Sequence, residues 1–169
     1  MRFQQYRSAL VTGALCCAFG VAQAGPVQVK EEVLLAATPA QVWAVIGDYA
    51  GLASWHPAVA KTGIVQGKNN QRGAVREVET RDGARLIESL QRMQPGRSMT
   101  YRIVESPLPV SDYQSTLSVQ AQGKGSRVIW KSRFNAINSP EMDDAKVKAL
   151  VAGIYRAGFD GLKERLGGR

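Results

Sequence analysis

Residues 85–90 read Arg85-Leu-Ile-Glu-Ser-Leu90, a short segment that we interpret as a strand with two unlike faces. Three later segments have the same character: Met99-Thr-Tyr-Arg-Ile-Val-Glu105, Tyr113-Gln-Ser-Thr-Leu-Ser-Val119 and Val128-Ile-Trp-Lys-Ser-Arg-Phe134. Successive side chains of a strand point to opposite faces of a sheet. One face of each segment is largely apolar, so the four strands decide the fold, because their apolar face has to be covered.

The predicted inner faces also carry spaced polar groups. Glu88 lies between Leu86 and Leu90, and Tyr101, Tyr113 and Trp130 occupy inner positions of the other three strands. An apolar surface with a few polar groups is typical of a ligand cavity. Core packing alone also accounts for the three aromatic residues, and both interpretations stay open. The sequence predicts a protein that binds something small and largely apolar.

Glu88 has two interpretations of similar weight. An inward carboxylate is costly unless it is paired, hydrogen-bonded or hydrated, and burial would raise its pKa toward that of a general acid or base. Alternatively, Glu88 is a structural partner of Arg76, Arg92 or a tyrosine inside the sheet. The first interpretation makes the protein a cyclase- or dehydratase-like enzyme that uses Glu88, His56 and Tyr113. We rank this hypothesis below simple binding, because no acid–base pair at fixed spacing is recognisable.

The rest of the chain predicts one sheet and one long covering helix. Asp82-Gly83 is a hairpin signal, and it is one of five turn sequences that divide residues 59–136 into six antiparallel strands. A first strand is expected over residues 28–36, a helix from the capping sequence Thr38-Pro-Ala-Gln41, and a short helical turn within residues 49–55. The last helix is expected to begin at Ser139 as N-cap. Its predicted apolar stripe consists of Val147, Leu150, Val151, Ile154, Gly158, Leu162 and Leu166.

The first 24 residues predict a secretory signal peptide. Arg2 and Arg7 precede a mostly apolar run over residues 9–21, and Ala22-Gln-Ala24 is a small-x-small cleavage signal. Both cysteines of the chain lie in this segment. We therefore expect a cysteine-free periplasmic protein, a single domain over residues 25–169, with no stable membrane insertion after cleavage.

The basic residues of the mature chain are scattered. The net charge is +8 for the whole sequence, and it falls to +6 without the two arginines of the signal peptide. No basic stripe of the kind found in nucleic-acid binders is present, so we expect no nucleic-acid partner. One histidine without cysteines or clustered acids provides no plausible zinc or iron ligand set. We expect neither a metal nor another cofactor.

Several separated segments, in order, resemble the START-like superfamily, also called SRPBCC or helix-grip. They are Ala37-Thr-Pro-Ala-Gln-Val-Trp-Ala-Val-Ile-Gly-Asp-Tyr49, Trp55-His-Pro-Ala-Val59, Tyr101-Arg-Ile-Val-Glu-Ser-Pro-Leu-Pro-Val110 and Gly153-Ile-Tyr-Arg-Ala-Gly-Phe-Asp-Gly-Leu-Lys163. The resemblance implies an α+β helix-grip fold: a curved antiparallel sheet of about seven strands (β-α-α-β6-α) around a long C-terminal helix, with an internal cavity. Within the superfamily the chain is most similar to the exported MxaD-like branch. That similarity implies a protein partner in a periplasmic methanol-oxidation system.

His56 is placed by the resemblance at the mouth of the cavity, where it either contacts ligand or fixes the entrance. The function favoured by the sequence is an exported, non-catalytic binding protein for a small hydrophobic molecule. An accessory role in methanol oxidation and an enzyme of the cyclase or dehydratase type are the alternatives. No catalytic residue is assigned. The candidate ligand-binding residues are Trp55, His56, Glu88, Tyr101, Tyr113, Trp130, Phe134 and Ile154.

Overall fold

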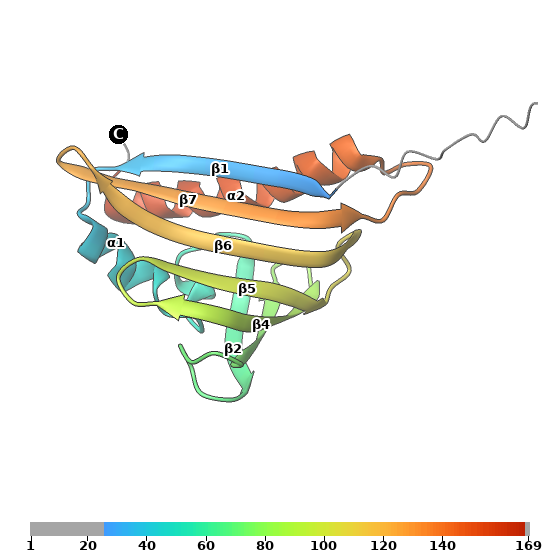
Figure 1. Ribbon diagram of the computed structural model, residues 1–169, viewed down its shortest axis with the longest axis horizontal. Helices are drawn as coiled ribbons and strands as arrows, with labels where there is room; N and C mark the ends of the chain where they lie inside the picture. Colours follow the sequence, from blue (N-terminus) through green and yellow to red (C-terminus); the bar gives the residue numbers. More distant parts are fainter. Residues whose placement is uncertain (1–25, 168–169) are drawn as a thin grey trace, which may run out of the picture.

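The computed structural model describes residues 26–167, and its seven strands form one antiparallel sheet in the order β1-β7-β6-β5-β4-β3-β2 (Figure 1). The predicted α+β helix-grip architecture, with six strands in a meander and a long final helix, is confirmed. The predicted signal peptide lies outside the described residues. The elements are β1 (Val27–Leu35), α1 (Pro39–Ile46), the 3-10 turn η1 (Leu52–Ser54), β2 (Val59–Gln66), β3 (Val75–Thr80), β4 (Arg85–Gln94), β5 (Ser98–Glu105), β6 (Val110–Gln122), β7 (Gly125–Ala136) and α2 (Asp144–Leu166).

The strand register agrees with the predicted faces. Tyr101 pairs with Leu90 of β4 and with Ser115 of β6, and Trp130 pairs with Leu117. All five side chains are buried, because they share the concave face of the sheet. The register shifts between Ile87 and Glu88 on β4, and such bulges bend a strand locally.

The helix α1 begins where the sequence predicted. The Thr38 hydroxyl accepts a hydrogen bond from the Gln41 backbone N–H at 3.4 Å, and the Gln41 side chain accepts one from the Thr38 N–H at 2.9 Å. This capping box satisfies two N–H groups that the first turn would otherwise leave free. The helix buries Val42 and Ile46 against the core and ends before Gly47.

The start of α2 was predicted four residues too early. Its N-cap is Asp143, whose carboxylate accepts the Lys146 N–H at 2.8 Å. The Ser139 hydroxyl instead accepts the N–H groups of Glu141 and Met142 and closes a separate turn. Both residue types are good N-caps, and the chain uses one for the turn and the other for the helix.

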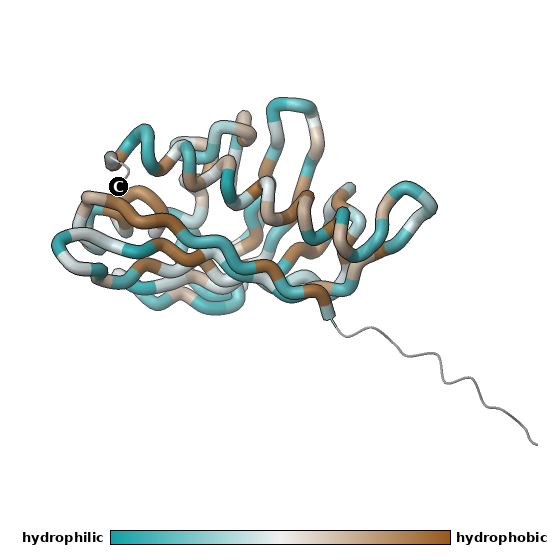
Figure 2. Tube along the Cα trace, turned by 90° about the horizontal axis from the view of Figure 1, so that it is seen from above, coloured by the Kyte–Doolittle hydropathy of each residue, from teal (hydrophilic) through white to brown (hydrophobic). Residues whose placement is uncertain are grey.

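The buried face of α2 is also rotated from the predicted stripe. Tyr155 and Phe159 are buried, whereas Leu150 is 39% exposed and Ile154 is half-buried. The helix packs mainly against β1, with fewer contacts to β7, and Figure 2 shows it along one side of the curved sheet. Strands β2 to β5 pack against the helix much less than β1 does. Among the described residues, no helix combines the length and apolar character that a membrane span requires.

Candidate functional site

A cavity of about 410 Å³ lies between the concave face of the sheet and α2. It exists because the helix covers the β1 and β7 side and leaves the inner faces of β3, β4 and β5 partly uncovered. Its volume is within the range of roughly 300–1,000 Å³ that is usual for small-molecule sites. Apolar side chains form most of the wall, notably Leu52, Val59, Val78, Leu86, Ile103, Leu108, Val151 and Ile154.

The lining residues that are not buried mark the opening of the cavity. The most exposed of them lie in the β3–β4 hairpin, represented by Asp82, at Ala58 before β2, at Pro107 in the β5–β6 loop and at Leu150 on α2. Leu150 is apolar and exposed at this position. An apolar molecule would therefore meet an apolar side chain before it reaches the interior.

An ion pair between Arg76 and Glu88 lies in the wall of the cavity. Arg76 is 3% and Glu88 is 6% exposed, and the Arg76 Nε and Nη2 atoms each lie 2.7 Å from Glu88 Oε2. Arg76 Nη1 donates to the backbone oxygen of Tyr49 at 2.7 Å. Burial lowers the pKa of Arg76 and is the largest single effect, but the Glu88 carboxylate together with Tyr49 and Tyr101 outweighs it. The pKa is therefore raised and the arginine stays charged.

The rings of Tyr49 and Tyr101 lie on the Arg76 guanidinium. Its central carbon is 4.3 Å from the Tyr49 ring centroid and 5.0 Å from that of Tyr101. Desolvated cation–π contacts of this kind contribute about 2 kcal/mol. Of the two interpretations of Glu88, the structural partnership with Arg76 is the one that the geometry supports.

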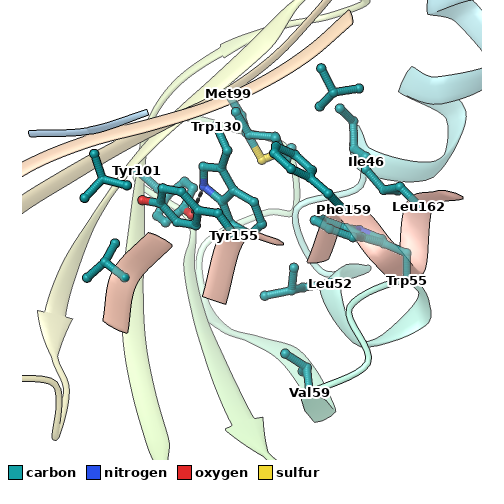
Figure 3. Close-up of a cluster of buried hydrophobic side chains, with 14 of the residues drawn as sticks. Ile46, Leu52, Trp55, Val59, Met99, Tyr101, Trp130, Tyr155, Phe159 and Leu162 are labelled. Atoms are coloured by element: carbon teal, nitrogen blue, oxygen red, sulfur yellow. Dashed lines mark hydrogen bonds between the residues drawn. The ribbon is translucent and has the colours of Figure 1, made fainter. Parts of the chain in front are cut away.

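Trp130 is the centre of the aromatic cluster beside the cavity (Figure 3). Its indole stacks on Tyr155, with ring centroids 4.4 Å apart and an interplanar angle of 9°. The indole N–H points to two oxygens, the Tyr101 hydroxyl at 2.9 Å and the Ser115 hydroxyl at 3.0 Å. The ring is therefore fixed by stacking on one side and by hydrogen bonding at its polar edge.

Three hydroxyl groups continue this network. The Tyr113 and Tyr155 hydroxyls are hydrogen-bonded to each other, and Tyr155 also contacts the Ser115 hydroxyl at 3.1 Å. Ser115 donates to the Lys131 backbone oxygen at 3.1 Å. Burial raises the pKa of the Tyr113 and Tyr155 phenols above its ordinary value, so both stay neutral.

His56 is buried between the loop that precedes β2 and the helix α2. Its Nδ1 accepts the Ala58 N–H at 3.3 Å, and its Nε2 lies 3.0 Å from the Ile154 backbone oxygen. These two contacts are satisfied by a neutral ring with the proton on Nε2. Burial is the main cause that lowers the pKa of His56 below 6.5. The ring therefore joins the loop to the helix, which matches the entrance-fixing interpretation.

Six of the eight predicted ligand-binding residues line the cavity: His56, Glu88, Tyr101, Tyr113, Trp130 and Ile154. Trp55 and Phe134 do not, and this part of the prediction needs correction. Trp55 packs on Trp130, at 5.7 Å between ring centroids. Phe134 stacks behind Tyr113, also at 5.7 Å. Binding of a ligand by the six cavity residues stays a prediction.

Two important residues of the site were not predicted as ligand-binding. Arg76 was considered only as a partner of Glu88, although it shares the inner face of β3 with Val78, and that alternation was a usable signal. Tyr155 was missed because the predicted stripe of α2 included Leu150 and Ile154 at one edge, whereas the buried face includes Tyr155 and Phe159 at the other. Within residues 26–167, no three His, Cys, Asp or Glu side chains come together as a metal site.

Comparison with known proteins agrees with this geometry. The family model described as polyketide cyclase / dehydrase and lipid transport matches residues 26–167. The protein XoxI from Bacillus cereus is 29% identical, with a TM-score of 0.75 over 83% of this chain and 95% of that one. This similarity is consistent with the MxaD-like branch.

Two further solved structures have the same fold. A protein from Bacillus thuringiensis is 28% identical, with a TM-score of 0.74 over 82% of this chain and 97% of that one. The major latex-like protein 151 of Panax ginseng is 12% identical, with a TM-score of 0.70 over 85% and 99%, and shows the fold alone. No curated protein matches the sequence.

Proposed function

The chain belongs to the polyketide cyclase / dehydrase and lipid transport family, and from this premise we propose that it binds a small, largely apolar molecule without transforming it. The family and the helix-grip neighbours support a ligand-binding protein of the SRPBCC type. The observation that carries the proposal is the cavity of about 410 Å³, whose walls are largely apolar. Burial of apolar surface supplies the affinity, at roughly 25 cal/mol per Å².

The contacts of the polar groups argue against catalysis. A general acid or base has to reach the substrate with a proton or a free lone pair. Both nitrogens of His56 are engaged with backbone groups, and Glu88 is held by Arg76. The enzyme alternative that uses Glu88 and His56 therefore requires His56 to abandon its two backbone partners.

A neutral, environment-sensitive dye such as Nile red tests the proposal. Wild-type protein is expected to bind the dye, and Ile103→Trp is expected to weaken binding by about tenfold, because the larger ring occupies the cavity. Val104→Trp is the matched control, since Val104 is the next residue of β5 and is 51% exposed. Native mass spectrometry of protein purified from its own host would identify a retained molecule. Equal dye binding by both variants would disprove cavity binding.

Export is a second part of the proposal and is supported by the sequence of residues 1–24. The protein would then act in the periplasm after cleavage before Gly25. The intact mass of the protein recovered from the periplasm measures this directly. Retention of Met1 in the exported form would contradict it.

An accessory role in a methanol-dehydrogenase-type oxidation system is the second candidate function. The MxaD-like segments of the sequence and the similarity to XoxI support it. In this role the protein would form a complex with another protein rather than with a small molecule. Affinity purification from methanol-grown cells should then recover a dehydrogenase or its cytochrome, and an unrelated gene neighbourhood would weaken this candidate.

A further inference from the structure

The hydroxyl protons beside the cavity can be assigned one at a time. Ser115 gives its single proton to the Lys131 carbonyl, so in its contact with Tyr155 the serine accepts and the tyrosine donates. The Tyr155 proton is then used, and the contact between Tyr113 and Tyr155 has to be donated by Tyr113. The protons of both phenols are consumed inside the protein.

Tyr101 is different from these two phenols. Its hydroxyl oxygen accepts the Trp130 N–H at 2.9 Å. The neighbouring Ser115 hydroxyl already accepts from Trp130 and Tyr155 and donates to Lys131, so it has no free lone pair for the Tyr101 proton. Burial raises the pKa of Tyr101 well above 10, so the proton is retained near neutral pH. Because Tyr101 lines the cavity, this O–H is available as a donor to a bound molecule.

Glu88 supplies the complementary acceptor. Both Arg76 contacts end on Oε2, and Oε1 accepts no hydrogen bond from the part of the chain that the structure describes. Glu88 lies on the same sheet face as Tyr101, on the adjacent strand and diagonal to it, since the residue paired with Tyr101 is Leu90. Diagonal neighbours are within reach of one another through long side chains.

We propose that the cavity selects a neutral molecule with an alcohol group, which accepts a hydrogen bond from the Tyr101 hydroxyl and donates one to Glu88 Oε1. An alcohol oxygen can do both at once, whereas an ether can only accept. A carboxylate can only accept as well, and it would add a negative charge beside Glu88, whose own charge already balances Arg76. This inference rests on the proposed binding function and specifies its ligand class.

Displacement of Nile red by three probes of equal chain length tests the ligand class. The probes are decanol, methoxydecane and decanoate, applied at a pH near 7.5 where decanoate is ionised. Decanol is expected to displace the dye at about tenfold lower concentration than methoxydecane, because only the alcohol donates to a charged acceptor. Decanoate is expected to be the weakest of the three.

Three Tyr→Phe variants test which phenol is the donor. Tyr101→Phe is expected to raise the decanol concentration needed to displace the dye by about fivefold or more. Trp130 keeps its hydrogen bond to Ser115 in this variant. Tyr113→Phe removes a proton that Tyr155 already accepts, so it should change the ratio between decanol and methoxydecane less than Tyr101→Phe does. Tyr49→Phe is the control for a buried tyrosine outside the cavity, because Tyr49 is buried but does not line the cavity.

The outcomes separate this inference from the proposed function. Equal displacement by the alcohol and the ether, stronger binding of decanoate, or an unchanged decanol response in Tyr101→Phe would each overturn the alcohol class while cavity binding stands. Failure of the wild-type protein to bind Nile red or any of the three probes would overturn the proposed function, and the alcohol class with it.

Discussion

Gly161 of α2 lies directly against the backbone of Trp55. A Cβ atom at residue 161 would be 2.1 Å from the Trp55 carbonyl oxygen and 3.0 Å from Pro57 Cδ. One turn earlier, a Cβ at Gly158 would be 2.8 Å from the His56 ring and 2.9 Å from Trp130. At both glycines the close contacts come chiefly from the loop that carries His56.

The first prediction compares two helix glycines. Gly161→Ala should lower the free energy of unfolding by about 2 kcal/mol or more, because the backbone of Trp55 cannot move aside without disturbing the core. Gly153→Ala is the control, since a Cβ there meets no atom within 4 Å. It should raise stability by up to about 1 kcal/mol through better helix propensity. Urea unfolding of both variants measures the difference, and equal effects would contradict the close approach.

The second prediction concerns the buried ion pair. Glu88→Gln leaves the Arg76 charge opposite a neutral amide and is expected to lower the free energy of unfolding by about 3–5 kcal/mol. The double variant Arg76→Met, Glu88→Leu removes both charges and should recover most of that loss. If Glu88→Gln were as stable as the wild type, the ion pair would not be buried in solution.

The third prediction is a dependence of stability on pH. Burial lowers the pKa of His56 from 6.5, so below pH 6.5 the unfolded chain binds a proton that the folded protein does not. The contribution of His56 is therefore constant above this pH, and stability falls as the pH decreases below it. The slope is at most about 1.4 kcal/mol per pH unit.

Urea unfolding at pH values of about 7.5 and about 5.5 measures this effect. The matched variant His56→Gln has no titratable ring and should show a smaller decrease over the same interval. An identical decrease in both proteins would assign the pH dependence to other groups.

The fourth prediction concerns the hydroxyl of Tyr49. It is buried and has no hydrogen-bond partner among residues 26–167. Removal of an unsatisfied buried hydroxyl is expected to be neutral or to stabilise the protein by about 1 kcal/mol. Tyr49→Phe retains the ring on Arg76. Thermal unfolding of this variant therefore measures the contribution of the hydroxyl alone to stability. Destabilisation by more than about 1 kcal/mol would indicate an ordered water that satisfies it.

The sequence by itself determined the features that depend on neighbouring residues. The alternation of side chains along a strand was sufficient to place Glu88, Tyr101 and Trp130 on the inner face. The spacing of Thr38 and Gln41 was sufficient to locate the start of α1. Both rules act over a few residues of backbone, whose geometry is nearly the same in every protein.

Only the tertiary structure decided which of these residues meet. The apolar side of α2 is broad enough to face the sheet at several angles, and its packing against β1 selected Tyr155 and Phe159 for the core and left Leu150 and Ile154 to the cavity. The same packing placed Trp55 against Trp130. The curvature of the sheet and the position of the helix result from the packing of the whole core, so no local segment encodes the partner of Glu88 or the free proton of Tyr101.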